Sequence, residues 1–469
     1  SVPRPATQFR VIRLGLLERR GGKTDLGMKQ PRLRILIVTS RDSGGGAPRA
    51  IHRLFRALKE NYSNECDVFL RVIHKSFDDS SIIGGKPRRS FLETTEYLLR
   101  TRWRKYFPRR PFSSDNPILH SQALYPSGLG REINRLNPDV ILMGWLGGST
   151  LSIREIGRLR SPIVWRLSDM WLFSGAEHYA YDKRYEVGYS RSSRRTSEEG
   201  PDINRETFLR KRRHWRQNSV VVAPSSWMSE QVRRSTLTRD WPTQTIPNSI
   251  NPDEWIPQPK LEARRQLGFS PRSKVVLFGA GSGLKDPHKG GDLFLETLER
   301  LSVLTQPSRG GPIVAPIFGQ DGQEFTIGVV RVVFLGHVSD EALKLAYSGA
   351  DVMVVPSRVD NFPSTAVEAQ TMGLPVLGFR VGGLPEIVDD GLTGLLVPPF
   401  EIESLAQGIK DLLFDEPKRN AMALQSRDRA LKLWDPQSVA GQYLDLLRTA
   451  CATTRKRQRS GRAMRDTLS

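Results

Sequence analysis

The feature that most constrains the fold of this chain is a strand–loop–helix–strand pattern at residues 350–386. Residues 352–355, Val-Met-Val-Val, form a short apolar run typical of parallel strands that are buried on both faces. A polar loop follows at residues 358–363, then a predicted helix at residues 364–373 and a second strand at residues 375–379. In doubly wound sheets, ligands bind beyond the carboxyl ends of such strands. We therefore expect a binding site in this loop and in the first turn of its helix.

Two acids, Asp360 and Glu368, lie in this unit with seven residues between them. Free backbone N–H groups at a helix start suit a phosphate or a sugar hydroxyl. Thr365-Ala-Val-Glu368 also has the spacing of a capping box, in which the glutamate would only cap the helix. Taken alone, the spacing leaves both roles of Glu368 open.

The wider pattern favours a binding role for both acids. Asp-Asn-Phe-Pro-Ser, Glu-Ala, Gly-Leu-Pro-Val and Gly-Gly-Leu-Pro-Glu follow one another between Asp360 and Glu386. Together they closely resemble the donor-binding signature of family 4 glycosyltransferases, which are retaining enzymes with two Rossmann-like domains. The resemblance implies that Asp360 contacts the transferred sugar and that Glu368 holds the ribose hydroxyls. Asp360 stands where the family more often has Glu, as in a branch typified by colanic-acid and exopolysaccharide transferases.

A second ligand-binding turn is predicted near the start of the chain. A buried-strand pattern at residues 33–39 is followed by Gly44, Gly45 and Gly46 and then by an amphipathic helix. Glycines allow a backbone to approach an anion closely. The triple glycine lacks the full G-x-G-x-x-G pattern, so it identifies no ligand by itself. The resemblance implies that this turn faces the donor diphosphate and the acceptor.

The acceptor side is predicted at the end of the strand at residues 162–167. The sequence there reads Ser168-Asp169-Met-Trp, with His178 just beyond. The same branch usually has His-Asp-Met-Trp, whose histidine faces the sugar and the acceptor. Because Ser168 replaces that histidine, Asp169 and His178 are the remaining candidates for polar contacts with the acceptor. A histidine on a surface loop is the alternative interpretation of His178.

The second half of the chain carries the predicted phosphate clamp. The family has an Arg and a Lys in one glycine-rich loop, both directed at the donor phosphates, and Lys289 matches the Lys. Gly283 stands where the Arg is expected, and Lys285 is a partial substitute. The turn at residues 336–340, with Val338, resembles the turn whose backbone contacts the nucleotide base.

The resemblance implies transfer of a sugar, with retention, from a nucleotide diphosphate sugar to a glycan or polyprenyl-linked acceptor in cell-surface polysaccharide synthesis. The departing diphosphate becomes more negative, so the reaction needs fixed positive groups and N–H donors. The chain has no Asp-x-Asp motif, and we expect neither a metal nor a cofactor beyond the nucleotide-sugar substrate. The predicted catalytic residues are Lys289, Asp360 and Asp169. The predicted donor-binding residues are Gly44, Gly45, Gly46, Lys285, Val338, Asn361, Phe362, Pro363, Ser364, Thr365 and Glu368.

A length of 469 residues suits two domains, each with its own core. The predicted fold class is α/β, with two Rossmann-like domains facing a cleft and a C-terminal helix that crosses back to the N-terminal domain. The predicted segments are a basic arm (1–31), an acceptor domain (32–248), a hinge (249–260), a nucleotide-sugar domain (261–433), a crossing helix (434–452) and a basic tail (453–469).

The chain is strongly basic, with 71 Lys and Arg against 50 Asp and Glu. Nucleic acid, an anionic membrane surface and a merely solvated basic surface are the competing explanations. No stacking motif or nucleic-acid fold accompanies the charge, so we do not expect nucleic acid and favour attraction to anionic lipid. The sequence shows no run of about 18 apolar residues, no signal-peptide pattern and only two cysteines. We therefore expect a cytoplasmic protein. Peripheral association at the inner face of the membrane is an option.

Three other classes of function stay open. An epimerase or a phosphorylase can use the same fold, because a fold does not determine its chemistry. A non-catalytic protein that binds nucleotide sugars, or a scaffold, would account for Ser168 and for the missing Arg. A nucleic-acid binder would lose affinity steeply as salt rises.

Overall fold

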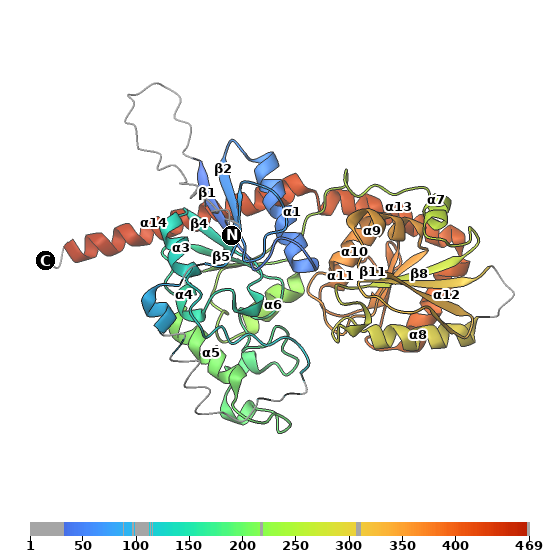
Figure 1. Cartoon of the computed structure of the whole chain (residues 1–469), viewed down its shortest axis with the longest axis horizontal. Helices are drawn as coiled ribbons and strands as arrows, with labels where there is room; N and C mark the ends of the chain where they lie inside the picture. Colours follow the sequence, from blue (N-terminus) through green and yellow to red (C-terminus); the bar gives the residue numbers. More distant parts are fainter. Residues whose placement is uncertain are drawn as a thin grey trace, which may run out of the picture.

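The computed structural model describes residues 32–87, 89–95, 98, 112, 114, 116–215, 219–305 and 311–466, and of residues 149 and 455–466 it describes the backbone alone. Two α/β domains lie side by side and are joined by one linking segment and by the C-terminal helix (Figure 1). The predicted basic arm, residues 88, 96–97 and 99–110, and the side chains of residues 455–469 lie outside the described residues.

The first domain is built on a parallel sheet in the order β3-β2-β1-β4-β5-β6-β7. Its central strands are short runs of Val, Ile and Leu because helices cover both faces of the sheet. Its strands are β1 (Leu33–Val38), β2 (Cys66–Arg71), β3 (Ile82–Ile83), β4 (Val140–Met143), β5 (Ile163–Arg166), β6 (Val220–Ala223) and β7 (Thr243–Thr245). Its α-helices include α1 (Gly46–Asn61), α3 (Leu129–Leu136), α4 (Ile153–Ile156), α5 (Ile203–His214) and α6 (Ser226–Arg234).

The second domain has a sheet in the order β10-β11-β9-β8-β12-β13-β14, in which only the β10–β11 pair is antiparallel among the described strands. Its strands are β8 (Lys274–Gly279), β9 (Ile313–Phe318), β10 (Phe325–Ile327), β11 (Val330–Gly336), β12 (Val352–Val355), β13 (Val376–Phe379) and β14 (Gly394–Val397). Its helices include α7 (Lys260–Gln266), α8 (Gly291–Leu304), α9 (Asp340–Gly349), α10 (Ser364–Thr371), α11 (Leu384–Ile387), α12 (Ile402–Phe414) and α13 (Glu416–Leu433).

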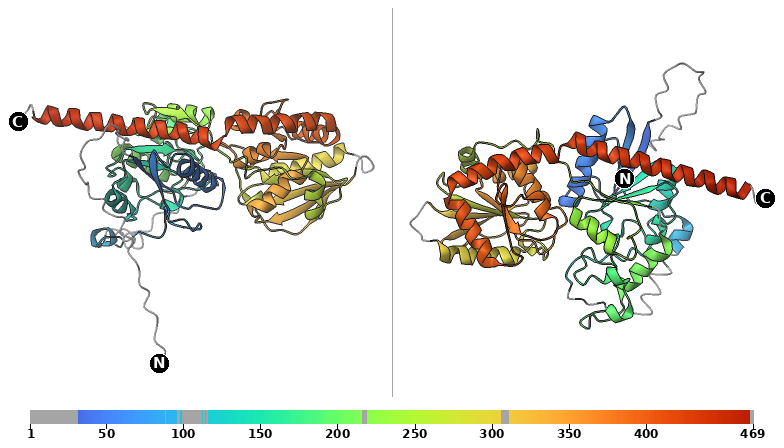
Figure 2. Two further views of the ribbon diagram at one scale, coloured as in Figure 1. Left: turned by 90° about the horizontal axis from the view of Figure 1, so that it is seen from above. Right: turned by 180° about the vertical axis from the view of Figure 1, so that it is seen from behind.

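The last helix, α14 (Pro436–Asp466), leaves the second domain and runs across the first (Figure 2). Its buried residues share one core cluster with α1 and with the first sheet: Val439, Ala440, Tyr443, Leu444 and Leu447. The predicted crossing helix is therefore confirmed as part of the fold class. It extends beyond the predicted end at residue 452, because the Arg, Lys and Gln residues that follow are good helix formers.

A second connection lies beside the start of α14. The backbone N–H of Ile250 donates to the carbonyl of Trp434 at 3.0 Å, so the linking segment between β7 and α7 pairs with the chain where it returns to the first domain. This segment contains the predicted hinge at residues 249–260, and the predicted domain boundaries stay a prediction. No helix within the described ranges is long and apolar enough to span a membrane.

Candidate functional site

A cavity of about 1130 Å³ lies between the two domains, at the carboxyl ends of both sets of strands. Its position is the one expected for a ligand site in doubly wound sheets. All of the predicted catalytic and donor-binding residues line this cavity. The structure therefore brings together residues that lie as far apart in sequence as Gly44 and Glu368, while the roles assigned to them stay predictions.

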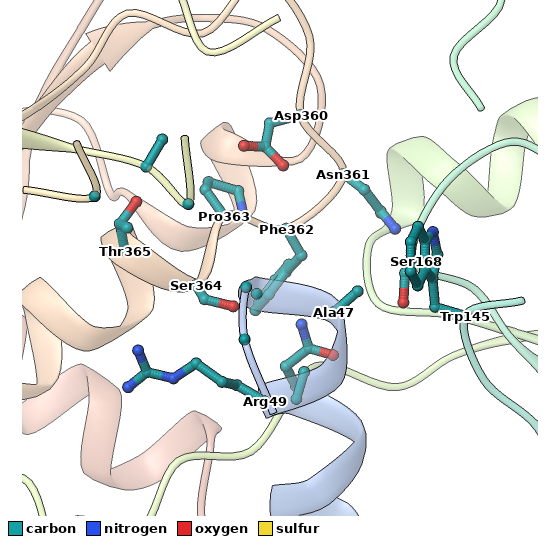
Figure 3. Close-up of a pocket in the computed structure, with 18 of the residues that line it drawn as sticks. Ala47, Arg49, Trp145, Ser168, Asp360, Asn361, Phe362, Pro363, Ser364 and Thr365 are labelled. Carbon is teal, nitrogen blue, oxygen red and sulfur yellow. The ribbon is translucent and has the colours of Figure 1, made fainter. Parts of the chain in front are cut away.

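Two helices begin at this cavity from opposite sides. Gly44 and Gly45 have φ values of 76° and 84°, which glycine adopts without strain, and α1 then starts at Gly46. Helix α10 starts at Ser364 (Figure 3), and a Cβ on Gly46 would lie only 3.2 Å from the Ser364 hydroxyl oxygen. Neither helix has a side-chain cap or an acid in its first turn. Two positive helix ends with free N–H groups thus face one space, which favours an anion there.

Lys289 lines the same cavity as these helix starts. Its Nζ is 2.5 Å from a carboxylate oxygen of Asp360, and both side chains line the cavity. The next residue, Gly290, has a φ of 70°, and a Cβ on it would collide with the carbonyl oxygen of Pro356. The close backbone approach at Gly290 therefore fixes the position of Lys289.

Residue 283, where the family has an arginine, cannot be an arginine in this loop conformation. Gly283 has a φ of 57°, and a Cβ on it would collide with the side chain of Gln320. Lys285 ends the short 3₁₀ helix that follows and lines the cavity. Positive charge near a diphosphate must therefore come from Lys289, from Lys285 or from the other domain.

Glu368 is 2% exposed and faces the cavity, so the capping-box interpretation is wrong. The N-cap of α10 is Pro363, and no side chain caps that helix. One carboxylate oxygen of Glu368 accepts a hydrogen bond from the Tyr347 hydroxyl at 3.0 Å, and the other accepts one from Arg53 at 2.7 Å. Burial and the Glu368 carboxylate raise the pKa of Tyr347 well above its usual value, so its hydroxyl stays a donor.

On the acceptor side, Asp169 is held by three donors. It accepts hydrogen bonds from the Trp145 ring N–H at 2.8 Å and the Trp171 backbone N–H at 2.9 Å, and its oxygen lies 2.5 Å from Nδ1 of His178. Burial alone would raise the pKa of Asp169, but His178 and these donors together hold it below its usual value. An ionised Asp169 is therefore available as a hydrogen-bond acceptor in the cavity.

His178 is 4% exposed, so the interpretation as a surface-loop histidine is wrong. Its second ring nitrogen lies 2.9 Å from the hydroxyl of Ser121, in a segment that folds over this loop. Ser168 accepts a hydrogen bond from Arg166 at 2.7 Å, and Arg166 also contacts Asn248 and Tyr443. His178 thus orients Asp169, and Ser168 belongs to a network that links β5, the linking segment and α14.

Several residues that line the cavity belong to no motif in the sequence. Arg49 and Arg53 project from α1 and reach the second domain. Tyr179 stacks on His288 across the cleft, with ring centroids 5.2 Å apart. The spacing of Arg49 and Arg53 places them on one face of a helix, but only the arrangement of the domains turns that face toward a ligand site.

The fold and the cavity together define a class: two Rossmann-like domains that face a cleft, as in glycosyltransferases of the GT-B type. The family model "Glycosyl transferases group 1" matches residues 326–429, which include α10. These findings confirm the predicted fold class and support a group 1 glycosyltransferase domain in the second half of the chain.

Relatives and solved structures agree with this class. The D-inositol 3-phosphate glycosyltransferase of Mycobacterium sp. (strain KMS) is 36% identical over 173 residues, which is 36% of this chain and 38% of that protein. The enzyme of the same name from Nocardioides sp. is 32% identical over 220 residues, or 43% of this chain and 47% of that protein. The matched regions thus span less than half of these relatives.

Among solved structures, HepE of Anabaena in complex with UDP and glucose superposes with a TM-score of 0.60 at 17% identity, covering 89% of this chain and 99% of that chain. Sucrose-phosphate synthase of Thermosynechococcus elongatus gives a TM-score of 0.58 at 19% identity, with coverage of 90% and 100%. At these identities the likeness establishes the fold alone.

Proposed function

We propose that this protein transfers a sugar from a nucleotide diphosphate sugar to an acceptor hydroxyl, with retention at the anomeric carbon. The observation that carries the proposal is the meeting of two uncapped helix N-termini, α1 and α10, in one cavity beside Lys289. Breaking the sugar–phosphate bond leaves charge on the diphosphate, and preorganised N–H groups and a lysine stabilise that charge. Because these groups are already in place, little reorganisation accompanies the reaction.

Each part of the donor has a matching part of the cavity. We assign the ribose hydroxyls to Glu368, the diphosphate to the helix starts and Lys289, and the transferred sugar to Asp360. The base lies against the turn that contains Val338. Asp169, on the opposite wall, accepts a hydrogen bond from the acceptor hydroxyl and orients it toward the anomeric carbon. Closure of the cleft would exclude water and limit hydrolysis of the donor.

For the acceptor, we propose a glycan or polyprenyl-linked sugar used in cell-surface polysaccharide synthesis. An ionised carboxylate at Asp169 favours a neutral hydroxyl over a phosphate, and the neighbouring Trp145 ring suits a sugar face. D-inositol 3-phosphate is the second candidate acceptor, because two relatives that match 36% and 43% of the chain carry that compound in their names.

We also propose that the protein works in the cytoplasm, against the inner face of the membrane. The net charge of +21 supports this location, since each basic residue near anionic lipid contributes about 1 kcal/mol. The test is to measure how much protein sediments with vesicles that contain anionic lipid, compared with vesicles of neutral lipid only. Equal binding to both kinds of vesicle would remove the proposal.

The decisive experiment incubates the pure protein with UDP- and GDP-sugars and measures nucleotide release, with and without glycan, polyprenyl-linked and D-inositol 3-phosphate acceptors. We expect release that depends on one sugar and one acceptor class. Conversion of the donor without any acceptor would indicate an epimerase, and release that requires free phosphate would indicate a phosphorylase. Nucleotide binding without any product would indicate a scaffold.

A further inference from the structure

Arg53 of the first domain is hydrogen-bonded to the carboxylate of Glu368, which belongs to the second domain. Its Nη2 donates to Oε1 of Glu368 at 2.7 Å, while Tyr347 donates to Oε2. Nη2 of Arg49 lies 3.5 Å from the same Oε1. Glu368 is almost fully buried, so both of its oxygens are engaged and shielded in this conformation.

The surroundings of Arg53 hold it in that position. Its guanidinium lies over the ring of Trp255, 5.2 Å from the ring centroid, and the Arg49 guanidinium lies 5.6 Å from the same centroid. Trp255 is a buried residue of the segment that links the domains. Arg49 in turn donates to Asp340 at the start of α9 at 2.7 Å. This face of α1 is therefore bound to the second domain by ion pairs and by a shared aromatic ring.

On the proposed function, Glu368 holds the ribose hydroxyls of the donor. We propose that Arg53 competes with those hydroxyls for Glu368 and closes the ribose subsite, so that a nucleotide must displace it. A guanidinium and a ribose hydroxyl both donate hydrogen bonds, and they compete for the same oxygen. Binding of the nucleotide thereby breaks one of the contacts that keep the two domains together.

A second side chain of the first domain, Tyr179, also lies against predicted donor residues. The hydroxyl of Tyr179, from the first domain, interacts with the backbone of Asn361, a predicted donor contact. Tyr179 is buried and stacks on His288 of the second domain. Side chains of the first domain thus lie against predicted donor contacts at Glu368 and at Asn361.

Titration with UDP and GDP alone, in the absence of sugar and acceptor, tests the proposal. We expect Arg53→Gln to bind the preferred nucleotide about tenfold more tightly than the wild type, because a charge-assisted hydrogen bond that competes with it is gone. Arg56→Gln is the matched control. Arg56 lies on the same helix, lines the same cavity and pairs with Glu60 and Glu254, so its loss removes the same charge without freeing Glu368.

Equal or weaker binding by Arg53→Gln, relative to Arg56→Gln, would overturn the proposal. Arg53→Lys keeps the charge and a donor, and we expect its affinity to lie near that of the wild type. In a Glu368→Gln background the gain from Arg53→Gln should largely vanish, because the shared partner has lost its charge. If no form of the protein bound either nucleotide, the proposed function would fail, and this inference with it. Binding by the wild type without a gain in Arg53→Gln would remove this inference alone.

Discussion

Lys289 and Glu368 occupy the two chemically distinct halves of the proposed donor site, one beside the phosphates and one beside the ribose. Lys289 forms an ion pair with Asp360, and Glu368 is buried against Tyr347. Neither contact is needed to build the core of its domain, since both side chains face the cavity. Their loss should therefore affect the reaction more than the fold.

We expect Lys289→Ala and Glu368→Ala each to reduce transition-state stabilisation by about 2 kcal/mol or more, as the loss of charged hydrogen bonds does. The measurement is kcat/KM for sugar transfer. Lys418→Ala, an exposed lysine on α13, is the control and should leave kcat/KM unchanged. Full activity in both site variants would contradict the site assignment.

A second residue-scale prediction concerns Glu177, which lies beneath the acceptor side. Its carboxylate is 1% exposed and contacts the hydroxyl of Tyr189, and burial raises its pKa to about 7. At pH values between the pKa of Glu177 in the unfolded chain and its higher pKa in the folded protein, only the folded protein holds this proton. The free energy of unfolding therefore falls as the pH rises through that range. The loss should approach about 3 kcal/mol above pH 7.

Glu177→Gln has no proton to lose at this position, so its stability should fall less between pH 5 and pH 8 than that of the wild type. Denaturant unfolding of both proteins at several pH values measures the difference. Parallel stability curves for the two proteins would show that Glu177 titrates normally in the folded state.

Site residues that belong to one local motif can be predicted from the sequence. Site residues that reach the cavity from another part of the fold cannot. Asp360, Ser364 and Glu368 follow one strand and one helix start, so their placement in one cavity follows from spacing. Arg53 and Tyr179 reach the cavity only because the first domain faces the second. The burial of His178 depends on a segment 57 residues away in sequence, which no local pattern reveals.

At the scale of single elements, the start of α1 is the most demanding feature. Gly46 has ordinary helical geometry, yet its position opposite Ser364 leaves little room for a side chain. An added methyl group at residue 46 would press on α10 across the cleft without straining its own helix, because alanine favours helices. The two helix starts, and with them the N–H groups that face the anion, would be forced apart.

We expect Gly46→Ala to weaken binding of UDP or GDP about tenfold, which corresponds to the loss of roughly one charge-assisted hydrogen bond. The melting temperature should change little, which separates the effect from misfolding. Gly46→Ala combined with Ser364→Gly removes the facing hydroxyl and should recover part of the affinity. Unchanged nucleotide affinity in Gly46→Ala would show that the helix starts do not contact the nucleotide.

Elements in the centre of each sheet are the predictable ones. Apolar runs in the sequence predict β1, β5, β12 and β13, because a strand buried on both faces needs apolar residues. The edge strands β3, β7 and β10 are only two or three residues long, and β7 reads Thr-Gln-Thr, so they carry no such pattern. Their pairing depends on the neighbouring strand instead of on their own composition.

At the scale of the whole molecule, a carboxylate of the second domain caps a helix of the first. Glu386 accepts hydrogen bonds from the backbone N–H groups of Ser226 and Trp227, at 2.7 and 3.0 Å, at the start of α6. Ser225 beside them also bonds to Asn361 at 2.9 Å. A negative charge at a helix start is favourable, so this contact stabilises the closed cleft.

We expect Glu386→Gln to destabilise the closed cleft by about 1 kcal/mol, since a carboxylate at a helix N-terminus contributes about that much. The radius of gyration in solution scattering should increase as the cleft opens. Glu416→Gln, which removes a carboxylate from the first turn of α13, is the control. An unchanged radius of gyration in Glu386→Gln would show that other contacts set the closure.

The position of α14 at the end of the chain affects how the first domain folds during synthesis. The first domain leaves the ribosome first, but Val439, Tyr443 and Leu447, which complete its core, are translated after the whole second domain. Until then an apolar strip beside α1 stays uncovered and is prone to aggregation. A nascent chain arrested before residue 436 should therefore engage chaperones, and maturation of both domains should finish together, only when the last helix emerges.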